Sequence, residues 1–174
     1  NAAALEAETI QVFAGNPRGW AHSAGTPQVD AAFRDACGER GIRAFIHAPY
    51  LVNLGSPTPA TYEKSVAVLA HNLRRAVEMG VEGVVVHTGS FVDPSDDNDK
   101  YDGVALTPAG RARYDAAMAQ VREGLLPLLE TLESDEAPWL LLEPTAGQGR
   151  SLCAGVEDLH PFLAALDFHP KAGI

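Results

Sequence analysis

The sequence predicts an α/β fold with a parallel β-sheet, either part of a (β/α)8 barrel or a doubly wound sheet. Apolar segments of strand length alternate with longer segments of helical periodicity, four times along the chain. From the second strand segment onward the strands are almost continuously apolar, which is typical of parallel strands buried on both faces. A complete barrel takes about 250 residues, so four such units in 174 residues would form about half of one.

The composition is that of one globular domain spanning residues 1–174, since 46% hydrophobic residues can build a core. No segment approaches the roughly 20 apolar residues that cross a bilayer, and no leader peptide opens the chain. We therefore expect a cytoplasmic protein without a membrane partner. The two cysteines do not make a disulfide framework, and a reducing cytoplasm suits them. A net charge of -10 argues against a nucleic-acid partner unless a basic groove or bound cations offset it.

Turn and capping residues locate the elements of the first half of the chain. The loop at 14–20 is assigned from its Gly, Asn and Pro content. Thr58 and Pro59 provide a capping hydroxyl and a proline at the first helical position, and Gly80 ends that helix. The expected elements are a helix tail at Ala2–Thr9, a strand at Ile10–Phe13, a helix at Val29–Glu39, a strand at Ala44–His47 and a helix from Pro59 with Tyr62, Val66, Leu69, Leu73 and Val77 on its apolar stripe.

The second half repeats the same alternation. The acidic segment that follows the third strand is interpreted as a solvated loop. Pro127 should bend or divide the helix in which it lies. The expected elements are a strand at Val84–His87, a helix from Thr107 and Pro108, a strand at Trp139–Glu143, a helix at about Val156–Leu166 and a turn into another strand at the end of the chain.

Three of the predicted strands end in residues that can bind a metal: His47, His87 and Glu143. The carboxyl ends of parallel strands converge on one side of an α/β sheet. Two imidazoles and one carboxylate form a catalytic zinc set, which leaves a position open for a water that the metal acidifies. One strand-end histidine more often only bonds a loop, but three matched positions favour a metal site.

Other reactive residue types carry weaker signals. His22 and His71 lie in polar or helical surroundings and are interpreted as surface groups. Cys153 follows a glycine-rich loop but has no evident partner base, so we interpret it as a buried or half-buried thiol rather than a nucleophile.

Four segments of the chain resemble the endonuclease IV family, and the resemblance covers most of the chain from about Gln11 onward. They are Asn16–Trp20, His47–Leu54, Val86–Ser90 and Leu142–Gly149. The family consists of zinc-dependent apurinic/apyrimidinic endonucleases on a TIM barrel of the xylose-isomerase-like superfamily. The resemblance thus implies about half of a TIM (β/α)8 barrel and hydrolysis of the phosphodiester 5′ to abasic sites in double-stranded DNA, as in base excision repair.

The resemblance also implies roles for individual residues. His47, His87 and Glu143 would bind one zinc of a three-zinc cluster, and Glu143 would bridge to a second zinc and so act as a catalytic residue. A hydroxide activated by the zinc ions would attack the phosphorus. DNA contacts are implied for four residues, namely Arg18, Tyr50, Leu51 and Gln148. A planar cation, an aromatic ring and an apolar wedge can unstack bases and fill the gap at a damaged site.

Two other interpretations stay open. A sugar isomerase of the xylose-isomerase-like superfamily would share the barrel and the strand-end ligands around a divalent metal. A homologue or fragment without catalysis would only bind metal. The loops that follow His47 and Glu143 match the nuclease better than the isomerase, and no protein partner is evident.

We predict little or no cleavage of abasic DNA by these 174 residues alone. The family's later ligands, an Asp-x-x-His strand and a second acidic and histidine cluster, have no match here, and the first barrel strand is expected ahead of Asn1. The test is incubation of an abasic-site duplex with protein whose intact mass equals that of this chain. Cleavage by that material would contradict the prediction.

Overall fold

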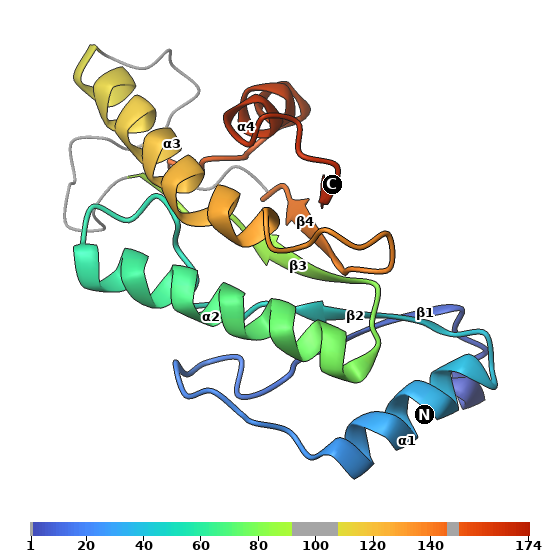
Figure 1. Ribbon diagram of the computed structural model, residues 1–174. Coiled ribbons are helices and arrows are strands. Elements are labelled where there is room, and N and C mark those ends of the chain that lie inside the picture. The colour runs from blue at the N-terminus through green and yellow to red at the C-terminus, as the bar shows by residue number, and fades with distance from the viewer. Residues whose placement is uncertain (1, 92–107, 146–149) are drawn as a thin grey trace.

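The computed structural model describes residues 2–91, 108–145 and 150–174, and it contains one parallel five-stranded sheet (Figure 1). The strands lie side by side in sequence order, as in an arc of a (β/α)8 barrel, whereas a doubly wound sheet reverses its strand order. The barrel alternative is therefore the correct one. The strands are β1 (Thr9–Val12), β2 (Arg43–His47), β3 (Gly83–His87), β4 (Trp139–Glu143) and β5 (Ala172–Gly173).

Helices connect successive strands, and α2 and α3 lie side by side on the same face of the sheet (Figure 1). The α-helices are α1 (Pro27–Gly38), α2 (Pro59–Met79), α3 (Pro108–Leu129) and α4 (Leu159–Ala165), and short 3-10 helices form η1 (Ala3–Leu5) and η3 (Val156–Asp158). Among these helices none is both long enough and apolar enough to cross a membrane.

Three helical expectations differ from the structure. The amino-terminal segment forms only the short η1 turn, and the predicted last helix is divided into η3 and α4. The division lies at Asp158, whose carboxylate accepts the N–H groups of Ala154 and Gly155 at 2.9 and 3.2 Å and so closes a tight turn. Pro127 does not divide α3, which continues to Leu129, and a bend at Pro127 stays a prediction.

Alternation along the strands separates a helix-facing side from an inner side of the sheet. Helix-facing residues are fully buried against α2 and α3; they include Ile46, Val84, Val86, Leu140 and Leu142. Successive side chains of a strand point to opposite faces, so Phe45, Val85 and Leu141 point inward. The strand-end residues His47, His87 and Glu143 share this inward direction, which places the candidate ligands inside the arc.

Helix α2 buries a different stripe from the one that its apolar positions predict. Leu69 and Leu73 are buried as expected, but Val77 is 59% exposed. The buried side of the helix instead includes the polar residues Ser65, His71, Asn72 and Arg75. Arg75, for example, is paired with Asp30 of α1. Such a pair cannot be predicted from the spacing of apolar residues along the helix.

Replacing Leu73 with Ala should lower the free energy of unfolding by about 2–5 kcal/mol, because the buried side chain leaves a cavity. Val77→Ala, one turn further along the same helix, should change it by less than about 0.5 kcal/mol. Denaturant unfolding of the two variants measures both values. An equal loss for Val77→Ala would show that Val77 is buried in the folded protein.

Candidate metal centre

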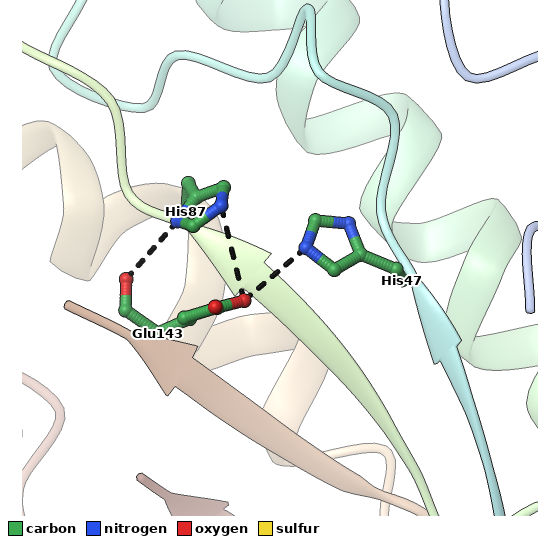
Figure 2. Close-up of side chains that lie close together, drawn as sticks. All are labelled: His47, His87 and Glu143. Carbon is green, nitrogen blue, oxygen red and sulfur yellow. Dashed lines mark hydrogen bonds and ion pairs between the residues drawn. The ribbon is translucent and has the colours of Figure 1, made fainter. Parts of the chain in front are cut away.

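Three possible metal ligands come together at the carboxyl ends of neighbouring strands, and we call this group the metal centre (Figure 2). His47 ends β2, His87 ends β3 and Glu143 ends β4. The parallel register places His87 directly beside Glu143. Nε2 of His47 lies 3.2 Å and Nε2 of His87 lies 3.8 Å from the same oxygen, Oε2 of Glu143. The structure thus brings together the three residues that the sequence singles out.

Two backbone carbonyl groups determine which nitrogen of each imidazole carries a hydrogen. Nδ1 of His47 lies 2.7 Å from the carbonyl oxygen of Ala48, and Nδ1 of His87 lies 3.3 Å from that of Glu143 (Figure 2 shows the second contact). A carbonyl oxygen only accepts hydrogen bonds, so Nδ1 is the donor in both contacts. In the neutral rings each Nε2 then carries a lone pair, and both lie beside the Glu143 carboxylate.

Three hydrogen-bond acceptors that converge on one point require a cation between them or additional protons on the rings. One possible ligand atom of each residue lies within 4.8 Å of the other two. Ligand atoms about 2.0–2.2 Å from a tetrahedral zinc are roughly 3.4 Å apart, which the 3.2 and 3.8 Å contacts bracket. The donor set and its spacing therefore fit a zinc ion. Within the described segments, no second group of three His, Cys, Asp or Glu residues is comparably close.

Solvent exposure differs across the metal centre. The side chain of His47 is 11% exposed, whereas those of His87 and Glu143 are 37% and 43% exposed. Beside Glu143 the inner face of the sheet forms a hollow of about 300 Å³, with Phe45 and Val85 among its walls. The arrangement holds one ligand firmly and leaves the other side accessible, as a site that admits water or substrate requires.

The loop after β2 carries Tyr50 and Leu51 at the edge of the metal centre. Both are exposed, and the Tyr50 ring centroid lies 6.0 Å from that of His47. Phe13, directly after β1, meets the Tyr50 ring edge-on at 5.4 Å and lies 5.5 Å from the His47 ring. We call Tyr50 and Leu51, two of the predicted DNA contacts, the wedge. Through the rings of Tyr50 and Phe13 the wedge is in contact with His47, a predicted metal ligand.

Arg18, another predicted DNA contact, lies exposed in the loop after β1. Its backbone N–H donates to Oδ1 of Asn16 at 3.0 Å, which shapes a tight turn. The backbone N–H of Tyr50 donates to the carbonyl of Pro17 at 3.0 Å. This hydrogen bond joins the loop that carries Arg18 to the loop that carries Tyr50. Gln148 lies outside the described residues, so its DNA contact stays a prediction.

Buried polar side chains anchor the rest of the loop after β1 to α2. Arg75 donates to both carboxylate oxygens of Asp30, at 2.6 and 2.8 Å, and to the carbonyl of Ala24 at 3.3 Å. The hydrogen bond from Arg75 lowers the pKa of Asp30 below its ordinary value. In the same region the ring of His22 stacks on that of His71, with centroids 4.5 Å apart.

The interpretation of His71 as a surface group is wrong. The residue is 5% exposed, because the loop after β1 packs over it. Burial, and to a smaller extent the nearby His22, Arg74 and Arg75, lowers the pKa of His71 below 6.5. His22 is exposed, as the sequence predicts.

Cys153 is fully buried, as expected for a thiol with a packing role. Burial, with a smaller contribution from Asp158, raises its pKa to about 11. The thiolate form is therefore scarce near neutral pH, which argues against a nucleophilic role.

Comparison with known proteins decides the family. The whole chain, residues 1–174, matches the family described as xylose isomerase-like TIM barrel. The chain belongs to this family. The half-barrel predicted from the sequence, and found in the strand order, is thus confirmed.

Several similar proteins are described as endonucleases. A probable endonuclease 4 from Streptomyces avermitilis is 53% identical over 170 residues, which are 98% of this chain and 49% of that protein. The endonuclease 4 of Thermus thermophilus is 40% identical over 161 residues, 91% of this chain and 49% of that protein. A crystal structure of endonuclease IV from Thermus thermophilus matches with a TM-score of 0.71 and 38% identity, covering 94% of this chain and 51% of that chain.

These matches confirm the resemblance to endonuclease IV, and the chain spans about half the length of the curated relatives it matches. A crystal structure of D-psicose 3-epimerase in the presence of D-fructose also matches, with a TM-score of 0.64. At 14% identity, covering 95% of this chain and 51% of that chain, it shows only the common fold. Membership of the TIM-barrel family therefore gives no support to the sugar-isomerase alternative beyond the barrel.

Two residues of the site were not predicted from the sequence. Phe13 has a weak signal, since it follows β1 with the inward alternation of Gln11. Asn53 lies within the segment that resembles endonuclease IV, yet nothing in the sequence shows that its side-chain oxygen contacts Ser90, which is 37 residues away.

Acid should destabilise the folded protein partly through His71. The unfolded chain takes up a proton on this ring below pH about 6.5, whereas the folded protein keeps it neutral to a lower pH. The free energy of unfolding should therefore fall as the pH drops below 6.5. His71→Phe preserves a ring to stack on His22 but cannot be protonated, so this fall should be shallower in denaturant unfolding at several pH values. The exposed His160→Phe should follow the wild type; an unchanged slope in His71→Phe would contradict the assignment.

Proposed function

We propose that this chain supplies His47, His87 and Glu143 as zinc ligands for hydrolysis of the phosphodiester 5′ to abasic sites in double-stranded DNA, a reaction that also needs the family's later ligands. The observation that carries the proposal is the metal centre itself. Two imidazole lone pairs, fixed by carbonyl groups, meet one carboxylate at the carboxyl end of a parallel sheet. The identity with proteins described as endonuclease 4 favours a nuclease over other uses of such a centre. The free cysteines suit base excision repair in the cytoplasm.

Each residue of the metal centre would have a separate part in the reaction. His47 and His87 bind through Nε2, while their Nδ1–H bonds to carbonyls orient the rings and keep Nε2 unprotonated. Glu143 supplies the anionic ligand and the oxygen that both histidines share. Bound zinc would acidify a water and offset the negative charge that develops on the phosphate. The exposed side of His87 and Glu143 gives the phosphate its approach.

Arg18, Tyr50 and Leu51 would enter the DNA at the damaged position. All three are exposed, and the hydrogen bond from Tyr50 to Pro17 holds their two loops together. The aromatic ring and the apolar side chain can replace the stacking lost at an abasic site, and the guanidinium can pair with a phosphate. Local positive charge is needed because the chain as a whole carries -10. Gln148 would add a contact from the loop after β4.

We expect the chain to bind about one zinc ion and, with zinc present, to prefer an abasic duplex to an undamaged one. Glu143→Gln keeps the size of the side chain but removes its charge, and should weaken zinc binding by at least about tenfold. The matched control is His160→Gln, an exposed histidine on α4. Zinc titration, metal analysis and binding to labelled duplexes measure these effects, and little or no 5′ cleavage of the same duplexes is expected from these 174 residues alone.

The outcomes separate the nuclease from its alternatives. Failure of the wild-type chain to bind zinc, or equal zinc binding by Glu143→Gln, would remove the metal centre from the proposal. Zinc binding without any affinity for either duplex would leave a metal-binding homologue without a DNA function, and equal affinity for both duplexes would exclude recognition of abasic sites. Turnover of a ketose in place of a DNA preference would establish the isomerase alternative.

A further inference from the structure

The side chain of Asn53 joins two of the loops that surround the metal centre. Its Oδ1 atom accepts the backbone N–H of Gly55, at 3.2 Å, within its own loop after β2. The same atom accepts the N–H of Ser90, at 3.0 Å, in the loop after β3. One side-chain oxygen thus satisfies two backbone donors that are 35 residues apart in sequence, at 55 and 90.

The backbone of Asn53 is held equally firmly from the helix side. Its N–H donates to Oγ of Ser65 at 2.9 Å, and Ser65 in turn donates to the carbonyl of Thr61 at 2.7 Å. Ser65 is fully buried on α2, so the anchor is on a rigid element. Asn53 therefore has little freedom to move away from Ser90 while α2 is folded.

Gly89 shows how closely the two loops approach. Its φ is +84°, a conformation that L side chains rarely adopt. A Cβ atom at this position would lie 2.3 Å from Oδ1 of Asn53 and 2.6 Å from its Cα, far inside van der Waals contact. Beside this contact the N–H of Leu54 donates to the carbonyl of Thr88 at 3.1 Å. The two loops therefore pack in close contact around Asn53.

The two joined loops carry different parts of the proposed site. The loop after β2 presents Tyr50 and Leu51, three and two residues before Asn53. The loop after β3 follows directly from His87, a member of the metal centre. The contact between Asn53 and Ser90 therefore ties the loop that carries Tyr50 and Leu51 to the segment that follows His87.

We propose that Asn53 is a positioning residue that sets where Tyr50 and Leu51 stand relative to the metal centre. It does so by accepting the N–H groups of Gly55 and Ser90 through one oxygen. The inference rests on the proposed nuclease function and assigns to Asn53 the alignment of damage recognition with cleavage. Asn53 itself contacts neither the ligand atoms nor the exposed tips of the wedge.

The test compares four variants with the wild type, each loaded with zinc. Asn53→Ala removes the acceptor, and Gly89→Ala forces it aside. Asn53→Asp keeps an oxygen in the same place and should restore function, because carboxylates accept such bonds well. Ser134→Ala is the matched control, since it removes the acceptor of the Glu136 N–H in the loop between α3 and β4, far from the site.

Three measurements distinguish positioning from general stability. The rate of amide hydrogen exchange at Gly55 and Ser90, measured without DNA, reports whether their hydrogen bonds to Asn53 are formed. Zinc binding per chain reads the integrity of the metal centre. The ratio of affinities for abasic and undamaged duplexes, together with 2-aminopurine fluorescence beside the abasic site, reports how Tyr50 and Leu51 engage the DNA. This ratio cancels the added charge of Asn53→Asp, because both duplexes carry the same phosphates.

We expect Asn53→Ala and Gly89→Ala to raise exchange at Ser90 and to lower the affinity ratio by about tenfold, consistent with the loss of two part-buried hydrogen bonds. Zinc binding should stay within about twofold of the wild type. Asn53→Asp and Ser134→Ala should match the wild type in the exchange and affinity measurements.

Some results would overturn the inference. Unchanged exchange at Ser90 in Asn53→Ala would show that the contact does not hold the loops. Raised exchange with an unchanged affinity ratio would show that the contact does not position the wedge, as would equal losses in Asn53→Ala and Asn53→Asp. If Asn53→Ala does not fold, Gly89→Ala and Asn53→Asp decide the same points. Failure of the proposed function is recognised separately, since the wild type itself would then show no preference for the abasic duplex.

Discussion

The parallel register of β2, β3 and β4 is the constraint on which the candidate site depends. Backbone hydrogen bonds place His87 beside Glu143, and His47 ends the next strand. A shift of β4 by one residue would turn Glu143 toward the helices and Leu142 into the arc, because side chains alternate between faces. The buried residues between sheet and helices oppose such a shift. Packing of the core between sheet and helices thus fixes the positions of His47, His87 and Glu143, although these residues lie outside the core.

Much of this arrangement could be predicted from the sequence because it follows from local pattern. Apolar runs locate the strands, and the residues that end them, His47, His87 and Glu143, lie together as the parallel fold requires. The pattern fails where burial depends on partners distant in sequence. Arg75 is buried because Asp30 reaches it from α1. The contact from Asn53 to Ser90 likewise exists only in the folded chain, and Val77 is exposed despite its apolar side chain.

Charge and metal are linked in this protein. A chain with a net charge of -10 would repel DNA at long range, so the proposed function requires attraction that arises close to the site. Glu143 adds a negative charge to this region. Zinc at the metal centre would reverse the sign of this region, while Arg18 supplies charge on the neighbouring loop. In the proposed function, metal binding and DNA binding would therefore be coupled, with the cation serving recognition as well as chemistry.

The DNA contact proposed for Tyr50 and Leu51 requires that both side chains be exposed, and exposure removes the usual source of rigidity. Tyr50 is 58% exposed and cannot be fixed by packing in a core. Rigidity can instead come from polar contacts at the base of the loop, since buried hydrogen bonds are costly to leave unmade. The loop has several of them, from Tyr50 to Pro17, from Leu54 to Thr88 and from Asn53 to Ser90. Each one ties the wedge to a loop that follows another strand of the sheet. The register that aligns the metal ligands therefore also aligns the wedge.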